Sequence, residues 1–193
     1  TKKQFNSQTT KFGEFAKNIG NEMIKKEPMF FNSDLDYAYE NGGEITRSFI
    51  ANLPNDWTHN VVFDSRIHML MPNWYPCIPG WHHDDVPRPE IPVGQHFISA
   101  GQPDYENTRY FSEHIVGLVN AEVCPTEFAI GHCEMPTVED GETVYKKWHE
   151  EVDNLVRSGK LKLEVAEDRV LYYFDWQCFH SGVKAKKNGW RWF

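Results

Sequence analysis

The chain has 193 residues, a length that suits one domain with a sizeable hydrophobic core. Its 40% hydrophobic and 25% charged residues are typical of a globular protein, and the absence of any run of eighteen apolar residues predicts no membrane-spanning helix. The net charge of −8 argues against a nucleic-acid backbone as the main partner, because that binding needs an excess of Lys and Arg.

The N-terminal part of the chain predicts one helix and two shorter elements. Apolar residues at spacings of three and four predict an amphipathic helix over residues 9–25, closed by Pro28. This helix makes residues 1–30 a helical extension. Residues 30–43 are polar and predict a loop, and the apolar positions within residues 45–50 predict a strand.

The rest of the chain predicts short strands separated by Gly and Pro turns. The candidates are residues 66–72, 95–100, 114–120, 126–131, 161–165 and 169–176. Residues 141–158 have apolar side chains at helical spacing before Gly159, and they predict an inserted helix. This pattern is typical of a closed or sandwiched β core. With no linker or repeat, residues 1–193 predict a single domain.

The cysteines predict a reduced, intracellular protein. None of the four forms a C-x-x-C pair, which argues against a zinc knuckle or a redox motif. We expect buried reduced thiols and a cytoplasmic location. The four residues are Cys77, Cys124, Cys133 and Cys178.

Two polar motifs fit together as a metal site. Residues 81–85 read Trp-His-His-Asp-Asp, and alternate side chains of a strand share a face, so that His82 and Asp84 can chelate one metal. A third ligand must then come from elsewhere in the fold, and His180 follows the last long predicted strand. Two imidazoles and one carboxylate on one face of an octahedron leave positions open for an oxo-acid and dioxygen, as in mononuclear iron(II) oxygenases.

Arg191 follows His180 by eleven positions, one short turn and strand further along the chain. Its planar guanidinium matches a carboxylate in bidentate fashion. It would suit the distal carboxylate of 2-oxoglutarate, a five-carbon diacid whose keto end lies on the metal.

These motifs resemble the Fe(II)/2-oxoglutarate-dependent dioxygenase superfamily, over roughly residues 66–193. Trp81-His82-His83-Asp84 is similar to the Trp-His-x-Asp segment of the phytanoyl-CoA dioxygenase branch, and the interval from His180 to Arg191 fits the same branch. The resemblance implies that His82, Asp84 and His180 are the catalytic metal ligands and that Arg191 anchors 2-oxoglutarate.

The resemblance also implies a fold and an activity. The fold would be mainly β, a double-stranded β-helix (a cupin-like jelly roll), with an N-terminal helix and an inserted helix near 141–158. The activity would be that of an oxidoreductase with Fe(II) and 2-oxoglutarate as cofactors. It would use dioxygen to hydroxylate a small organic substrate, with succinate and CO2 as co-products. The sequence has no signature of the substrate or of the oligomeric state.

The doubled residues of the first motif leave a second register open, in which His83 and Asp85 would be the ligands. A shift of one residue turns every side chain of a strand to the opposite face. We favour His82 and Asp84 because Trp81 directly precedes them in the resemblance.

Two other functions stay open. One is a cupin-like metalloenzyme that uses the same ligands without 2-oxoglutarate, and the other is a non-enzymatic jelly-roll binding protein. The other histidines lack a partner at ligand spacing and are expected to be surface residues or satisfied core residues rather than ligands. His68 is the least certain of them, because it precedes the first motif on a predicted strand.

Overall fold

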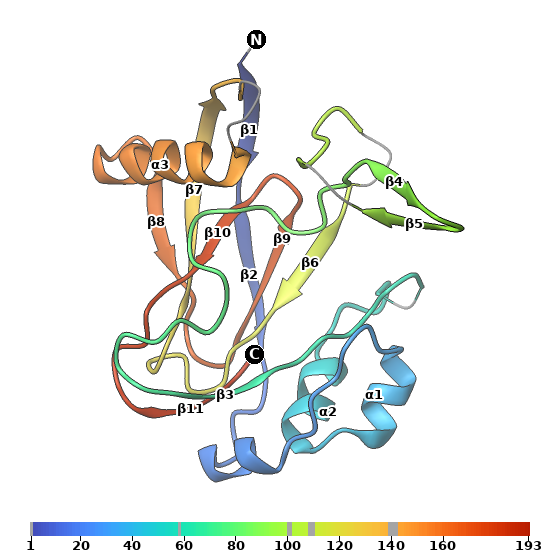
Figure 1. Ribbon diagram of the computed structural model, residues 1–193. Coiled ribbons are helices and arrows are strands. Elements are labelled where there is room, and N and C mark those ends of the chain that lie inside the picture. The colour runs from blue at the N-terminus through green and yellow to red at the C-terminus, as the bar shows by residue number, and fades with distance from the viewer. Residues whose placement is uncertain (1, 58, 100–101, 108–110, 139–142) are drawn as a thin grey trace.

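The longest strand, β7 (Thr126–Met135), organises the first sheet of this computed structural model, which describes residues 2–57, 59–99, 102–107, 111–138 and 143–193. The first half of β7 lies between β10 (Phe179–Gly182) and β8 (Lys162–Val165), and its second half pairs with β1 (Lys3–Ser7). The change of partner occurs at Gly131, whose φ of +140° is a conformation that favours glycine. All four strands are antiparallel to their neighbours (Figure 1).

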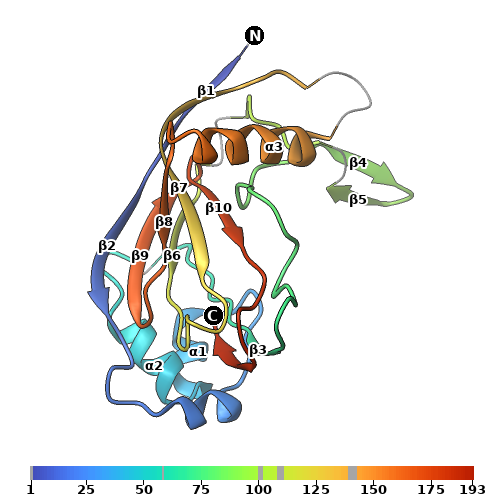
Figure 2. The ribbon, with the colours of Figure 1, turned by 90° about the vertical axis from the view of Figure 1, so that its left-hand side faces the viewer.

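The other strands form three smaller antiparallel groups. They are β2 (Thr9–Glu14) with β9 (Val170–Asp175) and β6 (Glu113–Val116), β3 (Ile67–Leu70) with β11 (Gly189–Trp192), and β4 (Glu90–Val93) with β5 (His96–Ser99). In Figure 2, β2 and β9 lie to the left of β7 and β10.

Buried aromatic side chains join these two layers. The ring of Phe128, on β7, lies 5.5 Å from the rings of both Tyr172 and Phe174, on β9. All three side chains are almost fully buried, and burying rings of this size contributes about 2 kcal/mol each. The protein is therefore mainly β, with antiparallel sheets whose packing is compatible with a β-sandwich.

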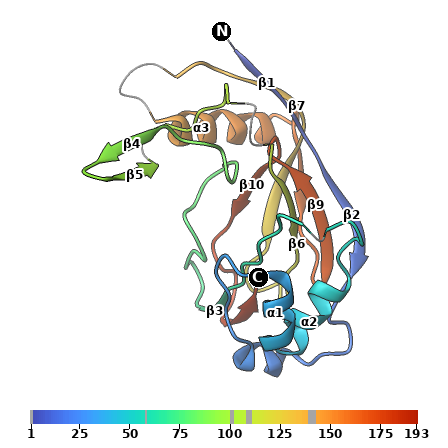
Figure 3. The same cartoon turned by 90° about the vertical axis from the view of Figure 1, so that its right-hand side faces the viewer.

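Helices cover opposite ends of the strands (Figure 3). The 3₁₀ helix η1 (Asn21–Lys26), α1 (Leu35–Asn41) and α2 (Glu44–Ala51) gather at one end, where their apolar residues share a core with Trp192. The inserted helix α3 (Val144–Arg157) packs on β1 and β7 at the other end. No helix in the described ranges is long and apolar enough to cross a lipid bilayer.

The predicted N-terminal helix is wrong. Residues 9–25 form β2, a turn and η1, so residues 1–30 contain two sheet strands in place of a helical extension. The strand is favoured because β2 pairs with β9 along its length, and Ala16, with φ of 53°, prevents a continuous helix. The apolar stripe still enters the core through Phe15 and Ile24.

Two further predictions in this region are wrong. The predicted loop at 30–43 contains α1, whose first turn is capped by the Asp34 carboxylate, which accepts from two backbone N–H groups. The predicted strand at 45–50 is α2. Its own N-cap, Gly43, has no capping side chain, and the buried Glu27 carboxylate accepts from the N–H of Ile45 at 2.7 Å instead.

The remaining predicted elements are confirmed. The predicted strands correspond to β3, β5, β6, β7, β8 and β9, and the predicted inserted helix corresponds to α3. Residue 100 of one predicted strand and residues 141–142 of the predicted helix lie outside the described residues.

Candidate metal centre

Three of the predicted site residues meet in space. His82, Asp84 and His180 each offer a ligand atom, and these atoms all lie within 4.8 Å of one another. His180 Nε2 lies 3.0 Å from Asp84 Oδ2, and His82 Nε2 lies 3.5 Å from Asp84 Oδ1. His180 is buried, His82 is partly buried, and Asp84 is half-exposed. This group could hold a metal ion.

Backbone hydrogen bonds bring the two imidazoles together. The N–H of His82 donates to the carbonyl of His180 at 3.1 Å, and the N–H of His180 donates to the carbonyl of His82 at 3.2 Å. The pair is an isolated antiparallel bridge, and the predicted strand at the first motif is limited to this contact. Beyond it, Asp85 has φ of 52°, which ends the extended conformation.

The alternative register is turned away from this group. His83 lies in the core, where its Nε2–H donates to the carbonyl of Gln177 at 3.0 Å and its Nδ1 accepts from the Tyr105 hydroxyl at 2.9 Å. The Asp85 carboxylate lies 3.9 Å from His114. Both His83 nitrogens are used in these hydrogen bonds, so the side chain has no free lone pair for a metal.

The outer hydrogen bonds of the two ligand histidines suit metal binding. His82 Nδ1 lies 2.7 Å from the carbonyl of Gly80, and His180 Nδ1 lies 3.0 Å from the carbonyl of Cys178. A carbonyl only accepts, so both Nδ1 atoms donate. Each Nε2 then faces Asp84, to which His180 Nε2 donates a hydrogen bond, and loss of that proton would leave both Nε2 lone pairs to a cation.

Asp84 and His180 favour each other's charged form, whereas the two histidines oppose each other's positive charge. Burial would raise the pKa of Asp84, but the hydrogen bond from His180 and the charges of both histidines hold it well below its usual range. Burial would lower the pKa of His180, but the hydrogen bond and charge of Asp84 raise it. Burial and the charge of His180 lower the pKa of His82. An ionised carboxylate and a neutral imidazole are the forms that bind metal, so a metal ion would have to displace the proton through which His180 bonds Asp84.

Arg191 is an almost fully buried cation, with 3% of its surface exposed. Its Nη2 donates a long hydrogen bond of 3.4 Å to Thr126 Oγ1, and its Nε has no hydrogen-bond partner. It forms no ion pair with any carboxylate in the described residues. A buried cation without a counter-ion is costly to fold and marks a place where an anion would bind.

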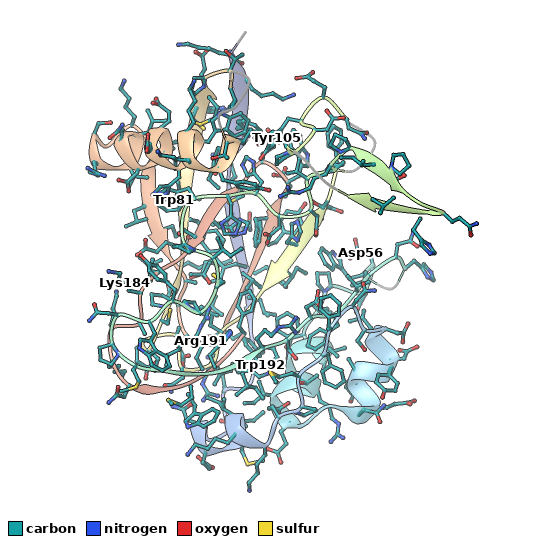
Figure 4. The ribbon with its side chains drawn as sticks, viewed as in Figure 1. Asp56, Trp81, Tyr105, Lys184, Arg191 and Trp192 are labelled. Carbon is teal, nitrogen blue, oxygen red and sulfur yellow. The ribbon has the colours of Figure 1, made fainter. Side chains whose placement is uncertain are left out.

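Strand register relates Arg191 to the metal group. On the β10–β7 pair, His180 lies opposite Phe128 and Gly182 lies opposite Thr126, so all four residues point to one face. Thr126 is the partner of Arg191. The guanidinium therefore lies on the same sheet face as His180, about two residues or ~7 Å further along the strands. Figure 4 shows Arg191 and Trp192 toward the β11 end and Trp81 nearer to α3.

Cys77 lies beside Gly182, a residue of the strand that carries His180. The charges of both Arg191 and Asp84 act on its thiol, whose pKa is raised mainly by burial. A Cβ atom on Gly182 would lie 2.5 Å from Cys77 Sγ, so only glycine fits there without a shift of the cysteine. The residue as a whole is exposed, unlike the other three cysteines, so the prediction that all four are buried is wrong for Cys77.

Sequence reasoning missed the support that α3 gives to the first motif. His149, on α3, accepts a hydrogen bond from the backbone N–H of Trp81 at 3.0 Å. Trp81 itself is buried in the core beneath α3. His149 has no partner at ligand spacing in the sequence, so no sequence pattern indicates this contact.

Comparisons with known proteins identify no similar protein. No protein-family model, curated protein or solved structure matches the chain. The functional argument therefore depends on the geometry of the site.

Proposed function

We propose that the protein is an Fe(II)- and 2-oxoglutarate-dependent oxygenase that hydroxylates a small organic substrate within a jelly-roll fold. The observation that carries the proposal is Arg191, a buried cation with no counter-ion among the described residues, on the sheet face that also bears His180. A metal group by itself is common to many proteins. A metal site combined with a buried arginine, at a distance that a five-carbon diacid can span, favours 2-oxoglutarate-dependent oxidation.

The residues present fit both groups. His82, Asp84 and His180 would hold the iron, because two neutral imidazoles and a carboxylate are ligands that iron(II) accepts. Arg191 would hold the far carboxylate, because its Nε–H has no acceptor and its Nη2 has only the long hydrogen bond to Thr126. When bound, iron and 2-oxoglutarate supply an oxidation by dioxygen, coupled to release of succinate and CO2.

The chain's own contribution is to bind, orient and shield. The carbonyls of Gly80 and Cys178 fix the direction of the two imidazoles. Phe174 lies 5.0 Å from the His180 ring and is itself buried against Phe128, so one wall of the site is apolar and excludes water. Arg191 fixes the orientation of the diacid, so that its keto end points along the strands toward His180.

An anaerobic titration with Fe(II) and 2-oxoglutarate tests the proposal. We expect the weak visible band of the metal-bound oxo-acid, and succinate formation once air is admitted. Metal binding without the band would favour a cupin-like metalloenzyme that does not use 2-oxoglutarate. Failure to bind Fe(II) would favour a non-enzymatic binding protein.

The role of Arg191 can be measured separately. The dissociation constant of 2-oxoglutarate, with Fe(II) present, is compared for the wild type, Arg191→Lys and Arg191→Ala. Loss of a buried charge partner costs on the order of 2–5 kcal/mol, which is roughly thirty-fold to several-thousand-fold in affinity. Arg191→Lys should rescue only in part, because an ammonium cannot form the bidentate fork. Equal affinities in all three proteins would contradict the assignment.

A further inference from the structure

His68 lies directly across from Arg191. The two residues are Cα partners in the antiparallel β3–β11 pair, so their side chains share a face. Each has a buried ring or guanidine nitrogen with no hydrogen-bond partner, His68 Nδ1 and Arg191 Nε. Buried polar atoms without a partner are rare in folded proteins, and two of them side by side indicate a missing acceptor.

The shared face points toward the candidate site. Ile67 and Trp192, on the opposite face of the same pair, pack into the core beneath the N-terminal helices. Leu70, on the His68 face, packs against Cys124, and Arg191 donates to Thr126 on β7. The side chains of His68, on β3, and Arg191, on β11, therefore point toward β7.

A carboxylate fits the two donors together. Its two oxygens offer about four lone pairs, enough for the Arg191 fork and one further donor. His68 is suited to be that donor because burial and the positive charges of Arg191 and Arg66 lower its pKa to about 4. At neutral pH it is an uncharged imidazole, which can donate from Nδ1 without adding to the repulsion of the buried arginine.

We propose that His68 is a second anchor for the far carboxylate of the 2-oxo diacid. Its Nδ1–H donates to one carboxylate oxygen while Arg191 holds the other. This inference rests on the proposed function. It adds a residue that selects a dicarboxylic over a monocarboxylic oxo-acid, because a ligand without the far carboxylate would leave both donors unsatisfied.

The test pairs two variants with two ligands. His68→Leu removes the donor, and His68→Asn keeps an N–H close to the position of Nδ1. The ligands are 2-oxoglutarate and 2-oxopentanoate, which has the same carbon chain without the far carboxylate. Dissociation constants are measured anaerobically with Fe(II), so the readout is binding and not turnover.

We expect His68→Leu to weaken the binding of 2-oxoglutarate by about tenfold to a hundredfold, which is the effect of losing a hydrogen bond to a charged group. The same variant should leave 2-oxopentanoate unchanged, and His68→Asn should restore 2-oxoglutarate binding to within a few-fold of wild type. His132→Leu, at an exposed position on β7, is the matched control, and Fe(II) affinity shows that each variant is folded.

Two results would overturn the inference. One is an equal loss for both ligands, which indicates a structural role, and the other is unchanged 2-oxoglutarate affinity in His68→Leu. If His68→Leu does not fold, the same two dissociation constants are measured for His68→Phe. A loss of affinity for 2-oxoglutarate alone would support the inference, and an equal loss for both ligands or no loss would contradict it. Failure of the proposed function is distinguishable, because then Arg191→Ala would also leave 2-oxoglutarate binding unchanged.

Discussion

His82 and His180 hold each other in register through two reciprocal backbone hydrogen bonds of 3.1 and 3.2 Å. This bridge joins residues that are far apart in the chain and places both imidazoles beside Asp84. A slip of one residue would put His83 in this position and move a well-satisfied histidine out of the core. The bridge therefore decides which half of the doubled motif can meet His180.

Asp84→Ala should weaken the binding of Fe(II), or of Co(II) as a spectroscopic probe, far more than Asp85→Ala. The Asp84 carboxylate is hydrogen-bonded to His180 and close to His82, whereas the Asp85 carboxylate lies 3.9 Å from His114, outside this group. Losing one of three ligands should cost at least the ten- to a hundred-fold that outer-shell changes cost. Metal titration of both variants measures this, and full binding by the Asp84 variant with loss in the Asp85 variant would favour the shifted register.

Arg191→Met should stabilise the protein and abolish its response to 2-oxoglutarate. Methionine fills a similar volume without burying an unpaired charge, and replacing even a buried ion pair by apolar side chains can stabilise by about 1–4 kcal/mol. Thermal melting with and without Fe(II) and 2-oxoglutarate measures both effects. In the wild type, ligand should raise the melting temperature, because a ligand that binds only the folded state adds to its stability. A variant that is much less stable than wild type without ligand would argue that Arg191 is a structural residue.

His149→Ala should weaken metal binding although His149 is no ligand. It leaves the Trp81 N–H without its acceptor, next to His82, at a cost of about 1–3 kcal/mol if the group stays buried. The loosened motif should lower Fe(II) affinity by roughly ten- to a hundred-fold. His132→Ala, at an exposed position, is the control. If His149→Ala lowers the melting temperature but leaves the metal affinity unchanged, the hydrogen bond from Trp81 to His149 stabilises the fold and does not support metal binding.

His68 should make the protein sensitive to mild acid. Burial, together with the charges of Arg191 and Arg66, lowers its pKa from 6.5 to about 4, so the folded state resists protonation that the unfolded state accepts. The stability that neutral His68 contributes is complete above pH 6.5 and is lost as the pH falls from there through about 4. Since the side chain is partly exposed, we expect at most about 1 kcal/mol per pH unit.

The free energy of unfolding, measured by denaturant between these pH values, checks this expectation. His68→Asn should show a shallower decline over the same interval, because asparagine does not titrate there. Identical slopes for the two proteins would show that other groups carry the acid sensitivity.

The helical regions show where the spacing of apolar residues predicts secondary structure correctly and where it fails. Apolar residues at spacings of three and four predict α3 correctly, since one face of that helix packs on the sheet. The same spacing at 9–25 predicts a helix wrongly, because Thr9–Glu14 forms the edge strand that pairs with β9. α2 is missed because its cap is Glu27, outside the helix, and no cap residue stands at Gly43.

The sequence by itself determined the chemistry that could be present: the Trp-His-x-Asp segment, a distant His180 and a trailing Arg191, on a chain whose strand patterns indicate a mainly β fold. Only the tertiary structure decided which of two registers meets His180, and that Arg191 and His68 lie side by side, each with one buried nitrogen that has no acceptor. The physical reason is that ligand geometry and burial depend on strands that pair across long separations. Such pairing is set by the packing of the whole sheet, and residue spacing carries no record of it.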